Sequence, residues 1–178
     1  MITLDNCQWI APIGTAGEWL IRSFEELGLG SFTMAEASSP FNGKTQKLFQ
    51  FGLVRHPVDW LETIFELLSG RDRGFYTPIL AEFSILETKD LDSFAYQYSQ
   101  LCPGAIGRFF GRHVCDSVVK CEDLPAGLYF AFDLVQSGIP QAQWGLKPLP
   151  RHHRKMDRSR QRLVMQNESN FVETYEYF

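Results

Sequence analysis

An arginine and a threonine stand where they could bind an anion. Arg55 directly follows the apolar run 48–54, and Thr63 lies eight residues further on, after His56-Pro57. Because proline suits the first turn of a helix, the two side chains should be separated by about two helical turns. A guanidinium offers a planar fork of donors to an oxyanion, and a hydroxyl adds one more. The pattern indicates a phosphate or sulfate site. The alternative is that Arg55 pairs with a surface acid and Thr63 has only a local role.

A glycine loop offers a second group of donors. Residues 14–17 (Gly-Thr-Ala-Gly) lie between the apolar run 7–11, ended by Pro12, and the amphipathic segment 18–27. Backbone N–H groups at the start of a helix attract anions. The loop has no lysine or arginine, so it lacks the Walker pattern GxxxxGK[ST]. Glu18 would repel a phosphate unless its side chain points away, and an ordinary strand-to-helix turn is the alternative.

Positive charge is concentrated in one segment of an acidic chain. The net charge is −4, and residues 151–162 hold five Arg, one Lys and one Asp, a sum of +5 that leaves −9 for the rest. This distribution favours a local anion site over general coating of nucleic acid. The basic strip ends the stretch 139–162, which contains several prolines and which we expect to be an irregular basic flap.

Alternating strands and helices should position these groups. Apolar runs predict buried strands at 7–11, 48–54 and 117–121. Helical spacing predicts helices at 18–27, 58–68 and 126–136, helical pieces within 79–101, and a final helix at 168–177. Such alternation indicates an α/β fold with a parallel sheet covered on both faces, whose ligands bind beyond the carboxyl ends of the strands. The 178 residues suffice for a single domain, 1–178.

The composition is that of a globular protein, with 44% hydrophobic and 21% charged residues. The four cysteines form no CxxC pair, which favours reduced, buried thiols over two disulfides. No apolar run approaches the length of a membrane span and the first residues do not read as a leader, so we expect a cytoplasmic protein without membrane contact. His152-His153 lack a third ligand, and we expect no metal.

Five segments, in this order along the chain, resemble the PAPS-dependent sulfotransferases, where PAPS is 3′-phosphoadenosine 5′-phosphosulfate. The central segment, residues 51–65 (FGLVRHPVDWLETIF), is similar to the family's 3′-phosphate-binding segment, and residues 14–20 (GTAGEWL) are similar to its 5′-phosphosulfate loop, SGTTWL. Weaker similarities are those of 119–124 (VKCEDL) to the family's YEDL, of 137–140 (SGIP) to its LGIP, and of 175–178 (YEYF) to its terminal YGY.

The resemblance implies a fold, a donor and a set of binding residues. The fold would be a three-layer α/β/α domain with a mainly parallel central sheet, like that of P-loop NTPases. The chain would bind PAPS and transfer its sulfuryl group to a hydroxyl or amine of a small molecule or glycan. Arg55 and Thr63 would bind the 3′-phosphate, and Glu36 is the candidate general base. The remaining binding residues that the resemblance implies are Gly14, Thr15, Ala16, Gly17, Glu18 and Trp19 on the 5′ side, with Arg151 and Arg154 closing over the nucleotide.

The chain departs from this family at the glycine loop. The family carries a Lys or Arg ahead of the loop's glycine, where this chain has Pro12-Ile13, and an arginine of the basic strip is a candidate substitute. Two alternatives stay open: a catalytically degenerate module that keeps the fold, and a different P-loop phosphotransferase such as a small kinase. Nucleic-acid binding through 151–162 is a further alternative, which the negative net charge disfavours.

Overall fold

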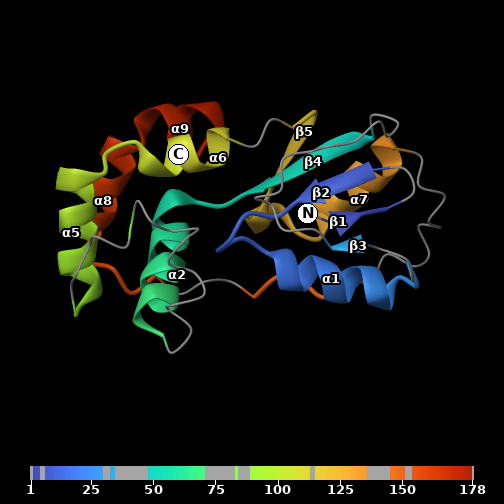
Figure 1. The fold of residues 1–178 in the computed structure, drawn as a ribbon, viewed down its shortest axis with the longest axis horizontal. Helices are drawn as coiled ribbons and strands as arrows, with labels where there is room; N and C mark the ends of the chain where they lie inside the picture. The colour runs from blue at the N-terminus through green and yellow to red at the C-terminus, as the bar shows by residue number, and fades with distance from the viewer. Residues whose placement is uncertain are drawn as a thin grey trace. The chain divides into compact units, whose positions relative to one another are not determined.

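The chain divides into two compact units that are each assembled from separate stretches of sequence. The computed structural model describes residues 2–4, 7–29, 33–34, 48–70, 83, 89–112, 115–135, 145–150 and 154–177. The first unit comprises Met1–Arg55 and His113–Arg151, and the second comprises His56–Arg112 and His152–Phe178. The first unit contains a β-sheet and the second is built from helices, as Figure 1 shows.

The sheet of the first unit is mixed. Its strands are β1 (Ile2–Thr3), β2 (Cys7–Ile10), β3 (Thr33–Met34), β4 (Phe49–Val54) and β5 (Ser117–Lys120), in the spatial order β3-β1-β2-β4-β5. The three strands predicted from apolar runs, β2, β4 and β5, are parallel to one another. The strands β1 and β3 are antiparallel additions. The α/β class is therefore confirmed, and the expected parallel sheet is the β2-β4-β5 part of a mixed one.

One face of this sheet packs against helices α1 (Gly17–Glu26) and α7 (Ala126–Leu134). The indole of Trp9 stacks on Phe51, with 4.9 Å between ring centroids, and Phe24 of α1 lies 6.0 Å from Phe132 of α7. Helix α7 lies very close to β5, because a Cβ added at Gly127 would come within 2.5 Å of Val119 Cγ1. These side chains form the buried core of the first unit.

The second unit is a group of helices around an aromatic core. They are α2 (Pro57–Ser69), α5 (Leu91–Leu101), α6 (Ala105–Gly111), α8 (Arg158–Asn167) and α9 (Ser169–Thr174). Helix α5 packs along α8, α2 contacts both, and α6 packs against α9. Trp60 of α2 is fully buried, and its ring contacts those of Phe83, Phe109 and Phe110. The aromatic-rich composition thus supplies the core of this unit.

The largest departure from expectation concerns the basic strip. Residues 154–157 belong to no helix or strand, but α8 begins at Arg158 inside the stretch expected to be an irregular flap. At its start, Asp157 accepts a hydrogen bond from the Ser159 backbone N–H at 2.7 Å. The final helix, expected at 168–177, is the shorter α9. Both helices carry few apolar residues, so hydrophobic spacing marks their limits poorly.

Candidate functional site

The loop between β2 and α1 has a defined turn. The backbone N–H of Thr15 donates to the Pro12 carbonyl at 3.1 Å, and its hydroxyl donates to the same oxygen at 2.5 Å. Gly14 has a φ of 78°, in the left-handed region that glycine adopts without a steric penalty. Helix α1 follows with Ala16 at its N-cap, a residue that supplies no side-chain cap. The loop therefore presents main-chain N–H groups at the start of a ten-residue helix.

Arg55 joins this loop from the end of β4. Its guanidinium Nη1 donates to the Gly14 carbonyl at 2.9 Å, a contact between residues 41 positions apart in the sequence. The arginine is partly exposed. The two segments in which the sequence predicted anion binding are thus brought together within the first unit.

Cys121, directly after β5, completes this group. Burial, and then the charge of Glu122, raise the pKa of its thiol to about 12, although the Arg55 charge and a hydrogen bond from the Ala16 backbone both lower it. The thiol is therefore neutral at physiological pH and adds no negative charge beside Arg55. The sequence prediction included Cys121 in the segment 119–124, which resembles the family, but gave it no role in the site. Its position directly after a predicted strand is the feature that could have indicated such a role.

Glu18 and Trp19 of α1 have contacts that clarify their predicted roles. The Glu18 side chain is 92% exposed, and its carboxylate lies 4.0 Å from Arg22, one helical turn further on. The indole Nε1 of Trp19 donates to the Lys147 carbonyl at 3.2 Å. Next to it, the Leu146 backbone N–H donates to the Tyr129 hydroxyl at 2.9 Å. Glu18 thus points to solvent, and Trp19 holds the segment 145–150 on the first unit.

Thr63 and Arg154 are both engaged with Asp59 inside the second unit. The Thr63 hydroxyl donates to the Asp59 carbonyl at 2.9 Å, and Arg154 Nε donates to the Asp59 carboxylate at 2.7 Å. Asp59 lies in the first turn of α2, so both contacts are made at the start of this helix. Thr63 belongs to the second unit and Arg55 to the first. The two predicted 3′-phosphate ligands are therefore each described within a different unit.

Three acidic residues of α2 bind the start of the basic strip. Glu62 is 1% exposed and accepts hydrogen bonds from the backbone N–H groups of Lys155, at 3.0 Å, and Met156, at 2.8 Å. The Lys155 ammonium lies 2.7 Å from the Glu66 carboxylate. With the Asp59–Arg154 pair, these contacts lie along one side of α2. We call Asp59, Glu62 and Glu66 the acidic stripe of α2.

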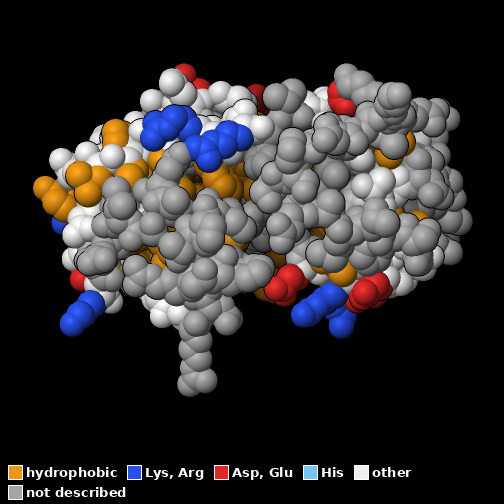
Figure 2. Space-filling view, in the orientation of Figure 1, with side chains coloured by type: hydrophobic (Ala, Val, Ile, Leu, Met, Phe, Trp, Pro, Cys, Tyr) orange, Lys and Arg blue, Asp and Glu red, His pale blue; other side chains and the backbone are white. Residues whose placement is uncertain are grey.

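Other cations of the strip are also distributed over the second unit. The Arg160 guanidinium lies 4.8 Å from the centre of the Tyr96 ring on α5. On the face drawn in Figure 2, the described Lys and Arg side chains form separate groups without a continuous patch. The described residues on this face therefore form no extended basic track.

His56 precedes α2 and serves as its N-cap. Its Nδ1 accepts the Val58 backbone N–H at 3.2 Å, and its ring meets that of Tyr177 at 5.3 Å between centroids. Burial, and then the Arg154 charge, lower the pKa of His56 to about 4, with Asp59 opposing them. The imidazole is therefore neutral near pH 7 and suited to capping, because only the neutral ring has an acceptor nitrogen.

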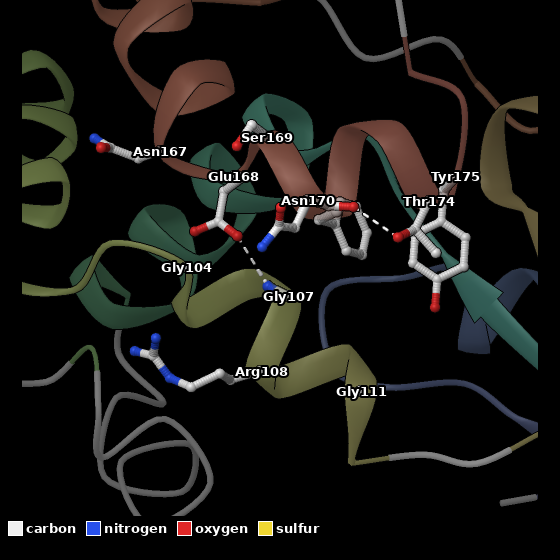
Figure 3. Close-up of a pocket in the computed structure, with 11 residues that line it drawn as sticks. Gly104, Gly107, Arg108, Gly111, Asn167, Glu168, Ser169, Asn170, Thr174 and Tyr175 are labelled. Carbon is white, nitrogen blue, oxygen red and sulfur yellow. Dashed lines mark hydrogen bonds between the residues drawn. The ribbon is translucent and has the colours of Figure 1, made fainter.

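A groove lies apart from these predicted residues, between α6 and α9 of the second unit (Figure 3). Its volume is about 440 Å³, and its walls include Gly104, Gly107 and Gly111 on one side and Asn170 and Thr174 on the other. The Glu168 carboxylate points toward α6, where it accepts the Gly107 backbone N–H at 2.9 Å. Tyr98 also donates to Glu168, whose pKa is raised by burial. This network ties α5, α6 and the α8–α9 junction together.

Glu36 and Arg151 lie outside the described residues, as do His152 and His153, so their predicted roles stay predictions. Within the described ranges, no group of three or more His, Cys, Asp or Glu side chains is arranged to hold a metal ion. Among the helices that the structure describes, none has both the length and the apolar character needed to cross a membrane.

Comparison with known proteins identifies no relative of this chain. No protein-family model, no curated protein and no solved structure matches it.

Proposed function

We propose that the chain is a sulfotransferase-like protein with a P-loop-like α/β fold that binds PAPS and transfers its sulfuryl group to a hydroxyl or amine acceptor. The observation that carries this proposal is the hydrogen bond from Arg55 to Gly14, because it joins the two segments that resemble nucleotide-binding motifs. The exposed Glu18 adds support, since its charge is directed to solvent and paired with Arg22. The parallel strands β2, β4 and β5 also fit, because ligands bind beyond such strand ends.

The proposed chemistry needs positioning and charge more than covalent help from the protein. The acceptor oxygen or nitrogen attacks sulfur, and the bond from sulfur to the 5′-phosphate oxygen breaks. The acceptor's proton passes to a general base, for which Glu36 is the candidate, and adenosine 3′,5′-bisphosphate leaves. Main-chain N–H groups of residues 14–19 would bind the 5′ side, and Thr63 the 3′ side. Arg151 and Arg154 would close over the nucleotide, with a small molecule or glycan as acceptor.

A second candidate is a nucleotide-binding module without transferase activity. The observation that favours it is the 2.7 Å ion pair between Arg154 and Asp59, together with the absence of Lys or Arg in residues 12–19. Both features reduce the positive charge available to stabilise a leaving phosphate. Binding of the nucleotide without measurable turnover on a panel of acceptors would identify this candidate.

Calorimetric titration with adenosine 3′,5′-bisphosphate tests the proposal. We expect saturable binding by the unmodified chain and a loss of about tenfold or more in affinity for Arg55→Ala, because a charge-assisted hydrogen bond to phosphate is removed. Arg22→Ala is the matched control, since Arg22 is exposed on α1 and should leave affinity unchanged. An unmodified chain that gives no heat of binding would exclude the proposed function.

A further inference from the structure

We infer that Lys147 supplies the positive charge that the glycine loop itself lacks, and that Trp19 holds this lysine beside the loop for the 5′-phosphosulfate of the bound donor. This inference rests on the proposed function. It gives a role to a lysine that no sequence motif singled out. It also changes the role of Trp19 from a residue that binds the nucleotide to a positioning residue. Both residues belong to the first unit.

Trp19 brings the segment 145–150 to the start of α1. It is the third residue of this helix, and long side chains on a helix lean toward its N-terminus, so the indole covers the turn before Trp19. That turn is the end of the glycine loop 14–17. The indole Nε1 donates to the Lys147 carbonyl at 3.2 Å. The backbone of Lys147 therefore lies beside the loop.

The residues on either side of Lys147 fix its backbone. The Leu146 backbone N–H donates to the Tyr129 hydroxyl at 2.9 Å, and the Leu146 side chain belongs to the same buried core as Ala16, the N-cap of α1. On the other side, Pro148 restricts Lys147 to extended backbone conformations. The position from which the lysine side chain starts is thus set by the fold of the first unit.

The charge of Lys147 is available to an anion. Its side chain is exposed, and its ammonium takes part in no hydrogen bond or ion pair with the residues that the structure describes. The acid of the loop region, Glu18, is 92% exposed and lies beside Arg22. A lysine carries its charge on a flexible four-carbon stem, so an ammonium anchored beside the loop can reach an anion bound there.

This position suits the charge that develops during transfer. When the bond from sulfur to the 5′-phosphate oxygen breaks, its electron pair stays on that oxygen, while the acceptor forms the new bond to sulfur and gives its proton to the base. An ammonium beside the 5′-phosphate would stabilise the growing negative charge. Lys147 would thus do for this chain what a Lys or Arg ahead of the loop's glycine does for the family that it resembles.

The test compares ligands that carry phosphate on one side only. Calorimetric titrations with adenosine 5′-phosphate, adenosine 3′-phosphate and adenosine 3′,5′-bisphosphate give separate affinities for the two sides. We expect Lys147→Gln to lose about tenfold for the 5′-phosphate and the bisphosphate, and to stay within about twofold for the 3′-phosphate. Lys147→Arg, which keeps the charge, should stay within about threefold for all three ligands. The matched control is Lys89→Gln, at an exposed lysine of the second unit, and it should bind like the unmodified chain.

A double-variant cycle tests the positioning role of Trp19. Trp19→Phe keeps an aromatic ring and removes the N–H that holds Lys147, so it should weaken binding of the 5′-phosphate by about threefold. If Trp19 acts through Lys147, the variant that combines Trp19→Phe with Lys147→Gln should lose no more affinity than Lys147→Gln alone. A purely structural role of Trp19 would add its loss to that of Lys147→Gln.

The outcomes separate the inference from the proposed function. Unchanged affinities in Lys147→Gln, a loss that includes the 3′-phosphate equally, or additive losses in the double variant would overturn the inference and keep nucleotide binding. An unmodified chain that binds none of the ligands would overturn both. If Trp19→Phe fails to fold, the comparison of Lys147→Gln with Lys147→Arg decides, because an exposed side chain can be changed without disturbing the core.

Discussion

At the residue scale, His56 shows how burial determines a protonation state. Its folded pKa of about 4 lies below its ordinary value of 6.5, so between these values the unfolded chain binds more protons than the folded one. The contribution of His56 to stability is therefore fully present above pH 6.5 and is lost as the pH falls toward 4. From the difference between these two pKa values, the loss is on the order of 3 kcal/mol.

His56→Asn should remove this part of the acid sensitivity. Asparagine is a good N-cap whose side chain does not titrate, so it can keep the hydrogen bond from Val58 while eliminating the proton uptake. Urea unfolding at a series of pH values measures the effect. We expect the variant and the unmodified chain to differ little at pH 8, and the variant to lose less stability between pH 6.5 and 4. Parallel pH profiles for the two proteins would contradict this expectation.

The residues of the candidate site were in part predictable from sequence. Arg55 and the loop at 14–17 were recognisable, because arginine after a buried strand and glycines before a helix are local patterns. Their contact depends on the register between β2 and β4, which local patterns do not specify. The pairing of Arg154 with Asp59 could not be predicted from the sequence either, because an arginine that could bind a ligand can equally bind an acidic residue elsewhere in its own chain.

At the element scale, the acidic stripe of α2 holds the basic strip by two kinds of contact that differ in strength. Glu62 is buried and accepts from the backbone of residues 155 and 156, whereas the Lys155–Glu66 pair has side chains that are 66% and 50% exposed. Buried donors left without an acceptor cost free energy, while exposed ion pairs are weakened by water and salt.

Glu62→Ala should therefore lower the free energy of unfolding by about 2–4 kcal/mol, since it leaves two backbone donors beside the buried Met156 without their acceptor. Glu66→Ala is the matched control on the same helix and should cost less than about 1 kcal/mol. Urea titration of both variants checks the ranking. Equal losses, or a larger loss for Glu66→Ala, would mean that the exposed ion pair and not the backbone contacts holds the strip.

The elements that the sequence predicted best are those with a clear apolar pattern. The strands β2 and β4 are short runs with mostly buried side chains, β5 is a short apolar run in which Val119 is buried, and α1 and α2 repeat apolar residues with helical spacing. Helix α8 was missed because Val164 is its buried residue and the rest of RSRQRLVMQN is largely polar. The two-residue strands β1 and β3 were missed because a periodicity cannot be read from so few positions.

At the scale of the whole molecule, the division into two units follows packing between segments that are distant in sequence. The chain passes from one unit to the other after residues 55, 112 and 151. The first of these passages is the interval between β4, which ends at Val54, and α2, which begins at Pro57. The amino-acid composition does not change at this passage. For that reason the sequence predicted a single domain without an internal boundary.

A chain that ends at residue 151 should separate the two units experimentally. It retains the whole of the first unit, including the core formed by Trp9, Phe51 and Leu128. It removes α8 and α9 from the second unit, and with them Phe171, whose ring lies 5.3 Å from that of Phe110, and Glu168, which accepts from the α6 backbone. The second unit should then lose its fold.

Amide hydrogen exchange distinguishes this expectation from its alternative. In the shortened chain, amides of β2, β4 and β5 should stay protected, because their partners and their helical cover all belong to the first unit. Amides of α2, α5 and α6 should exchange at the rate of an unfolded chain, while in the full chain they should be protected. Loss of protection in the sheet as well would mean that the two units fold only together, and that the sheet depends on the helices for its stability.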